Sequence, residues 1–160
     1  MKIIFVTGPA LSGKTIYANT HYPDAMHITI EAFKEVLAAA ESNDEVEKIS
    51  ENIEHYCKDT LTEAIAAAKE DDEIVLEHPM LTKAERAFFV KGVRETTDAP
   101  IDCILMCPDD ETIHKMLFGQ PLTIKLYEFE RSKLEMPDTD EGFATVKVVN
   151  PVIADEYLTV

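Results

Sequence analysis

Apolar and polar positions along the chain form two alternating patterns. Short apolar runs, typical of strands buried in a sheet, lie at residues 3–7, 26–30, 73–76, 101–106 and 143–149. Between these runs, apolar residues recur at steps of three and four, as they do on helices with one face on a core. Helices are predicted from about residue 13 to 22, and at 31–40, 44–69, 82–94, 108–117 and 122–135.

Local signals mark several of these boundaries. Thr82-Lys-Ala-Glu85 is a capping box that starts a helix, Pro23 ends the first helix, and Gly119-Gln120-Pro121 separates the last two. Because strands alternate with helices, the sequence predicts an α/β fold, a three-layer sandwich with a parallel sheet covered by helices on both faces. We expect residues 1–160 to form one such domain.

The charge of the chain narrows the classes of partner. Its 160 residues carry a net charge of −16, with 46% hydrophobic and 29% charged residues. This balance is typical of a folded globular protein, and the net charge argues against a broad basic surface that binds polyanions. A small basic cleft inside an acidic shell remains compatible with it.

Targeting and redox signals are few. The apolar run at residues 3–6 is too short for a signal peptide, and no apolar stretch approaches the roughly 20 residues of a membrane span, so we expect a cytoplasmic protein with no membrane partner. Cys57, Cys103 and Cys107 form no CxxC pair and suggest free structural thiols. A metal bound by Cys103 and Cys107 is the less favoured alternative.

A phosphate-binding loop follows the first strand. Gly8-Pro-Ala-Leu-Ser-Gly-Lys14-Thr15 matches the P-loop motif G-x-x-x-x-G-K-[ST] in full, with an apolar strand before it and a helix after it. The glycines allow a tight turn whose N–H groups face phosphate oxygens, beside the positive end of the following helix. Lys14 can reach the β- and γ-phosphates, and the Thr15 hydroxyl can coordinate Mg²⁺.

The motif therefore predicts ATP and Mg²⁺ as cofactors. The predicted nucleotide-binding residues are Gly8, Pro9, Ala10, Leu11, Ser12, Gly13, Lys14 and Thr15.

Two acids lie at the ends of predicted strands. Glu31 follows residues 26–30 and Glu77 follows residues 73–76, and ligands of open α/β sheets bind at the carboxyl ends of strands. Either acid could accept a proton from a hydroxyl or hold Mg²⁺, whereas the structural alternatives are a helix N-terminal acid and a surface acid. His78 beside Glu77, and Lys34 one turn after Glu31, are candidate substrate contacts; a structural hydrogen bond and an ion pair with Glu31 are the alternatives.

The motifs together resemble the P-loop kinases, and most of all the group around the kinase domain of bacteriophage polynucleotide kinase. The resemblance rests on four features besides the loop and the acid-bearing helix after the second strand. These are Glu77-x4-Thr82-x2-Glu85-Arg86, Cys107-Pro108-Asp109-Asp110, Leu134-Glu-Met-Pro137 and Asp140-Glu-Gly-Phe143.

The resemblance implies a P-loop NTPase fold, with a five-stranded parallel sheet in the order 2-3-1-4-5, and transfer of the γ-phosphoryl group of ATP to a hydroxyl. In that family an acid after the second strand is the general base and an arginine one turn later binds substrate phosphate, so the resemblance implies these roles for Glu31 and Lys34. Thr15 and Glu77 are the predicted metal ligands, and Lys34, His78 and Arg86 are the predicted substrate contacts. Lysine in place of the arginine that the resemblance implies cannot make a two-pronged phosphate contact.

The segment that corresponds to the kinase lid, at about residues 112–121, differs from the family pattern. Lys115 fits the first basic position and is the predicted catalytic cation, but Gly119 lies near the place of a second arginine. Arg131 could reach in from further along the chain, or it could lie on a helix surface. Because such arginines can raise the rate roughly a thousandfold or more, a lid poor in charge argues against fast transfer.

Two functions stay open at this point. The first is a kinase that acts on the hydroxyl of a nucleoside, a nucleotide or a polynucleotide 5′ end, and the resemblance favours the last of these while the acidic net charge favours a small acceptor. The second is a nucleotide-binding regulatory or interaction module, or an NTPase, in which kinase chemistry has degenerated.

Overall fold

The computed structural model describes the chain except for residues 31–35, 37, 117–120 and 152–160. Its strands are β1 (Lys2–Thr7), β2 (Met26–Thr29), β3 (Glu73–Glu77), β4 (Ile101–Met106) and β5 (Thr145–Val149). Its helices are α1 (Lys14–His21), α3 (Asn43–Ala67), α4 (Lys83–Arg94), α5 (Asp110–Met116), α6 (Pro121–Ser132) and the 3-10 helix η1 (Thr139–Glu141). The predicted alternation of strands and helices is confirmed.

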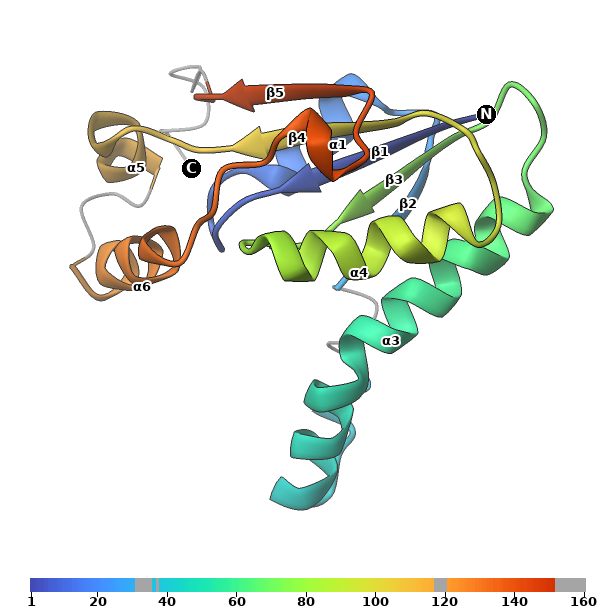
Figure 1. Cartoon of the computed structure of the whole chain (residues 1–160). Coiled ribbons are helices and arrows are strands. Elements are labelled where there is room, and N and C mark those ends of the chain that lie inside the picture. The colour runs from blue at the N-terminus through green and yellow to red at the C-terminus, as the bar shows by residue number, and fades with distance from the viewer. Residues whose placement is uncertain (31–35, 37, 117–120, 152–160) are drawn as a thin grey trace.

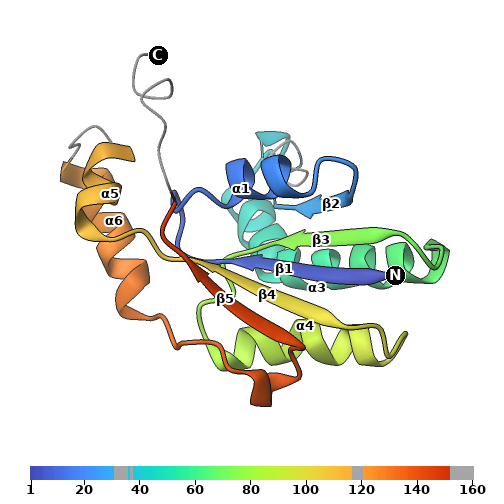
Figure 2. The same ribbon diagram turned by 90° about the horizontal axis from the view of Figure 1, so that it is seen from above.

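The five strands form one parallel sheet in the predicted order, β2-β3-β1-β4-β5 (Figure 2). The strand β1 is central, with Val6 paired to Glu77 of β3 on one side and to Ile104 of β4 on the other. From β1 the chain passes to β2 and then β3 on one side of it, and it later crosses to β4 on the other side. Ligands bind at such a switch point, at the carboxyl ends of the strands.

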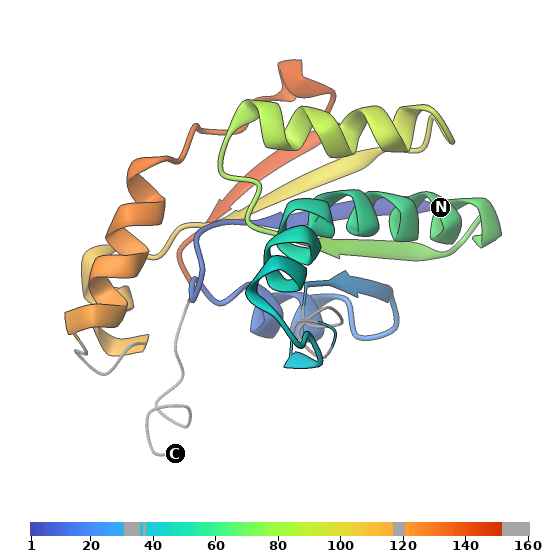
Figure 3. The same ribbon diagram turned by 90° about the horizontal axis from the view of Figure 1, so that it is seen from below.

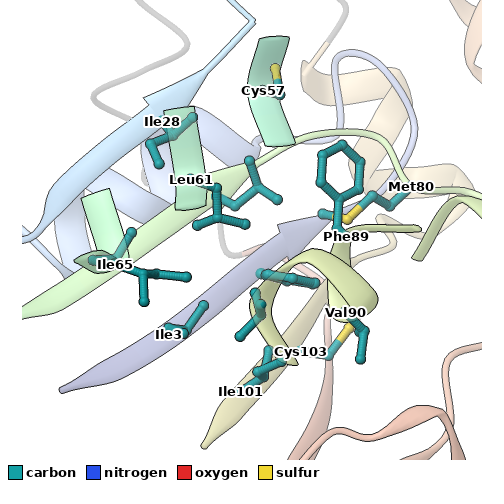
Figure 4. Packing of buried hydrophobic residues seen from close by; sticks show 14 of the residues in the cluster. Ile3, Ile28, Cys57, Leu61, Ile65, Met80, Phe89, Val90, Ile101 and Cys103 are labelled. Atoms are coloured by element: carbon teal, nitrogen blue, oxygen red, sulfur yellow. The ribbon is translucent and has the colours of Figure 1, made fainter. Parts of the chain in front are cut away.

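Alternate residues of β1 belong to two separate cores. Ile3 and Phe5 face a large cluster that includes Leu61 of α3 and Phe89 of α4, and Figure 4 shows this packing close up. Ile4 and Val6 face the other side, where they pack with residues of α1. Helices thus cover both faces, as predicted, and Figure 3 shows α3 and α4 lying across one of them.

The helix α3 begins at its Ser42 cap, whose hydroxyl accepts a hydrogen bond from the Glu45 N–H. Figure 1 shows its first half projecting away from the sheet, while its second half lies under the sheet. Cys57, Leu61 and Ile65 of that second half are buried in the larger core. The apolar stripe predicted along this helix therefore reaches the core only in part.

Two boundaries differ clearly from the sequence prediction. The last strand begins at Thr145 rather than residue 143, because Phe143 is buried in the core and Gly142, at φ +99°, turns the chain just before the ladder begins. The helix α6 ends at Ser132 instead of residue 135. The helix predicted at 31–40 falls mostly on residues outside the described part of the chain.

Two short helices stand beyond the carboxyl ends of the strands. Figure 1 shows α5 and α6 there, next to the loop that follows β1. The buried Tyr127 hydroxyl of α6 donates a hydrogen bond to the Pro108 carbonyl at 2.7 Å, which fixes α6 to the segment after β4. This arrangement brings residues of α6 to the sheet edge where the first loop lies. Within the described ranges, no helix has the length and apolar character needed to cross a membrane.

Candidate functional site

The loop between β1 and α1 has the backbone shape that its glycines permit. Gly8 has a φ of +136°, and a Cβ there would lie 2.4 Å from the Met106 carbonyl oxygen at the end of β4. Gly13 has a φ of +91° and caps α1. Any larger residue at Gly8 would collide with the backbone of β4, so the loop is seated closely on the sheet edge.

The Lys14 ammonium folds back onto this loop. It donates hydrogen bonds to the carbonyl oxygens of Gly8, at 2.9 Å, and of Pro9, at 2.7 Å. Burial lowers the pKa of Lys14 to about 8, against the opposing effect of the nearby carboxylates Glu77 and Glu130. Burial disfavours the charged form of Lys14, so negatively charged phosphate oxygens beside the ammonium would stabilise it.

The predicted metal ligands lie together. The Thr15 hydroxyl, in the first turn of α1, donates a hydrogen bond to the Glu77 carboxylate at the end of β3. Glu77 is 8% exposed, so its charge is directed at the loop and not at bulk water. A hydroxyl and a carboxylate are hard oxygen donors, which is the set that Mg²⁺ prefers beside phosphate oxygens.

His78 is buried directly beside this pair. Burial, helped by the charge of Lys14, lowers the pKa of His78 to about 4, so its imidazole is neutral at physiological pH. Its ring lies 5.0 Å from that of Phe89. Among the described residues, His78 Nδ1 and Ser12 Oγ are the two buried side-chain polar atoms without a hydrogen-bond partner, and His78 borders the same loop as Ser12. Unsatisfied buried groups at one place are typical of a site that awaits a ligand.

A cleft of about 470 Å³ lies over the loop. Its lining residues come from the loop, the end of β2, the end of β3 and α5, and they are Ala10, Leu11, Gly13, Lys14, Thr15, Ile16, Ile30, Glu77, His78, Pro79 and Met116. The structure therefore brings together five of the eight predicted loop residues, Glu77 and His78 around one cavity.

Glu130 of α6 is a residue of this site that the sequence did not point to. Its carboxylate accepts a hydrogen bond from the Ala10 N–H at 2.5 Å. The motif predicts the phosphate-binding loop but gives no sign of which distant segment touches it. The spacing from the buried Tyr127, three positions earlier and so on the same helix face, is the one signal available.

Lys115 of the predicted lid and Arg131 beyond it both make ion pairs with acids. Lys115 lies 2.8 Å from Glu111 within α5, and Arg131 of α6 lies 3.0 Å from Asp110. Both cations are at least two-fifths exposed, so these pairs add little stability and can exchange partners. The role of Lys115 at the transferred phosphoryl group stays a prediction.

Arg86 lies in the core and not at the cleft, which corrects its predicted place at the substrate. Its side chain is fully buried; Nε donates to Glu141 at 2.7 Å, and Nη1 donates to the carbonyl oxygens of Met80 and Leu81. Met80 has a φ of +43°, which is unusual for a side chain of this kind. Arg86 thus holds the bend that follows His78.

That bend in turn supports the phosphate-binding loop. The Gly8 N–H donates to the Pro79 carbonyl at 3.0 Å, and the His78 N–H donates to the Val6 carbonyl at 3.2 Å. Glu31, Lys34 and Gly119, by contrast, lie outside the described residues, and their predicted roles stay predictions. Of the cysteines, Cys57 and Cys103 are buried, and no cluster of acids, histidines and cysteines suited to a metal occurs in the described part of the chain.

Comparisons with known proteins agree with this geometry. A family model described as an AAA domain matches residues 3–121. No curated protein sequence matches the chain. A sugar kinase from a Janibacter species has a similar structure at 17% identity and a TM-score of 0.63, over 99% of this chain and 90% of that chain.

Two further solved structures are similar at lower identity. Kti12 from Chaetomium thermophilum, in complex with ADP-AlF3, aligns at 15% identity and a TM-score of 0.61, over 98% of this chain and 93% of that one. A gluconokinase from Sinorhizobium meliloti aligns at 14% identity and a TM-score of 0.58, over 98% and 87%. At these identities the likeness shows a shared fold, the P-loop NTPase α/β fold; the finer resemblance to polynucleotide kinase stays a prediction.

Proposed function

The chain belongs to the AAA domain family, and from this premise we propose that it binds Mg²⁺–ATP and transfers the γ-phosphoryl group to a hydroxyl of a small acceptor. The observation that carries the proposal is the meeting of Lys14, Thr15 and Glu77 at the loop between β1 and α1. Nucleotide binding without transfer would need only the loop and Lys14. The buried carboxylate beside the Thr15 hydroxyl adds a place for the metal that phosphoryl transfer requires.

The residues of the site have separate tasks in this proposal. Loop N–H groups and the Lys14 ammonium neutralise the phosphate oxygens, while Thr15 and Glu77 would hold Mg²⁺, which would supply further positive charge to the phosphates. An acceptor oxygen bonds to the γ-phosphorus as the bond to the ADP oxygen breaks. The hydroxyl proton passes to a carboxylate, for which we propose Glu31.

His78 is suited to the acceptor because it is neutral. A neutral imidazole in the cleft wall can accept a hydrogen bond from a hydroxyl or donate one to it, whereas an imidazolium would favour phosphate. The pKa of His78, lowered by burial to about 4, keeps this form at all physiological pH values.

The acidic shell supports a small, hydroxyl-rich acceptor. A net charge of −16 repels long polyanions, and the sugar kinase and the gluconokinase of similar fold act by their names on small polyols. A nucleoside, a nucleotide or a polynucleotide 5′ end remains an outcome of the test below.

A second candidate is a nucleotide-binding module with little transfer activity. The ion pairs of Lys115 with Glu111 and of Arg131 with Asp110 support it, because both cations are paired with acids of α5.

One experiment separates the candidates. The protein is incubated with γ-labelled ATP and Mg²⁺, against separate panels of sugars and sugar acids, nucleosides and nucleotides, and 5′-hydroxyl oligonucleotides. A labelled sugar or other small alcohol supports the proposal. A labelled oligonucleotide would mean that the acceptor is a polynucleotide 5′ end and not a small alcohol. ATP binding with no labelled product supports the module. Lys14→Ala is the negative control throughout, and a wild-type protein that binds no ATP overturns both candidates.

A further inference from the structure

We infer that Glu130 is a specificity-determining residue of the nucleotide site: its carboxylate holds the loop N–H at the terminal-phosphate end, so ATP must displace it and ADP need not. The inference rests on the proposed nucleotide binding and adds to it a residue from a different part of the chain.

The contact places an anion inside an anion-binding loop. The Ala10 N–H donates a hydrogen bond to Glu130 Oε2 at 2.5 Å, and Glu130 lies on a helix 120 positions further along the chain. N–H groups of such a loop are directed at phosphate oxygens. A carboxylate that accepts one of them competes with phosphate for the same donor, and its negative charge repels a phosphate that approaches.

The position of Lys14 tells which end of the loop is involved. Its ammonium lies on the carbonyl oxygens of Gly8 and Pro9, directly before Ala10 in the chain, and the charge of Glu130 opposes the lowering of the Lys14 pKa. Glu130 and the ammonium are therefore neighbours. In P-loops this lysine reaches the β- and γ-phosphates, so the carboxylate lies on the side of the terminal phosphate.

The carboxylate is held there by a fixed helix. Tyr127 of α6 is fully buried and bonded to the Pro108 carbonyl, and the Glu135 N–H just after α6 donates to the Leu81 carbonyl at 2.8 Å. Glu130 itself is only partly buried. Its side chain can therefore rotate toward solvent while the helix stays in place, which makes it displaceable.

The two nucleotides should respond differently. A γ-phosphate brings charge to the position of the carboxylate, so ATP binding includes the cost of breaking the contact with Ala10. The α- and β-phosphates of ADP lie nearer the α1 end of the loop, so ADP can bind with the contact intact. Glu130 thus narrows the preference of the loop for ATP over ADP.

The test measures dissociation constants of Mg²⁺–ATP and Mg²⁺–ADP by calorimetry on the full chain. Glu130→Gln should tighten ATP binding roughly tenfold and change ADP binding less than twofold. Glu128→Gln, an exposed acid on the same helix, removes the same net charge and should leave both constants unchanged. Glu130→Asp, whose side chain is one methylene shorter, should also tighten ATP binding. This variant replaces Glu130→Gln in the test if the glutamine variant does not fold.

Other outcomes overturn the inference. Equal tightening of both nucleotides would mean a general charge effect, and weaker ATP binding would mean that Glu130 supports the nucleotide. Unchanged constants with a lower melting temperature would mean a purely structural contact. In each of these cases the wild type still binds ATP, so the proposed function stands. A folded wild type that binds neither nucleotide removes the proposed function itself.

Discussion

The Thr15 hydroxyl donates a hydrogen bond to the Glu77 carboxylate, which joins the first turn of α1 to the end of β3. Because this pair is the proposed Mg²⁺ site, Glu77→Gln should remove the part of ATP binding that depends on the metal. Thermal unfolding with ATP, in Mg²⁺ and in EDTA, measures that part. The wild type should melt several degrees higher in Mg²⁺, whereas the variant should melt at about one temperature in both.

Glu73→Gln is the matched control for this variant, since Glu73 is an exposed acid at the other end of the same strand. It should keep the Mg²⁺-dependent shift of the wild type. An undiminished shift in Glu77→Gln would exclude Glu77 as a metal ligand.

ATP affinity should fall as pH rises above neutrality. Burial lowers the pKa of Lys14 to about 8, so the free protein loses this charge between pH 7.5 and 9, while the triphosphate binds its protonated form. The dissociation constant for Mg²⁺–ATP should rise roughly eightfold over that interval. Competition with a fluorescent nucleotide measures it. In Lys14→Ala, the dissociation constant of the residual binding should not rise over this pH interval. A rise of the same size in this variant would mean that another group causes it.

His78 should reduce stability in acid. Its pKa of about 4 in the folded protein lies below the roughly 6.5 of an unfolded chain, so the unfolded state binds the extra proton between these values. The protein therefore has its full stability, as far as His78 is concerned, above pH 6.5. As the pH falls toward 4, the free energy of unfolding decreases by about 3 kcal/mol because of His78. Urea unfolding at pH 7 and pH 4.5 measures it. His78→Gln should lose less stability between the two pH values, and an equal loss would contradict the assignment.

The ion pair between Arg86 and Glu141 should matter far more than those on the surface. Arg86→Met leaves a mostly buried carboxylate without its partner and should lower the free energy of unfolding by about 3 kcal/mol, as measured in urea. Lys2→Met breaks a pair with Asp102 in which Lys2 is 46% exposed, and it should cost less than about 1 kcal/mol. Similar losses in both variants would mean that burial of the Arg86 pair has no special role.

The sequence alone predicted the scaffold well, for physical reasons that act locally. Short apolar runs and amphipathic stretches determine which segments become strands and helices, and the Thr82–Glu85 capping box fixed one helix start correctly. The loop motif predicted the places of Lys14 and Thr15, and Glu77 was predicted near them because it follows a strand and parallel strands end at one edge of the sheet.

Contacts across the sheet could not be predicted in the same way. Arg86 was expected at the substrate from its place in a motif, but its neighbour Glu141 belongs to a turn 55 positions away, and no local pattern links the two. The contact of Glu130 with Ala10 depends likewise on how α6 is oriented by Tyr127, which is a matter of tertiary packing.

The central place of β1 in the sheet has a consequence for how the protein is made. Of the five strands of the sheet, β1 is synthesised before the other four, yet its two neighbours, β3 and β4, follow only after long intervening segments. The nucleotide loop therefore emerges before both of these strands, and it lacks the second of them until residue 106 has been synthesised. Protection of a nascent chain by ATP should accordingly begin only with chains long enough to expose β4, so the ligand would report the completion of the fold during translation.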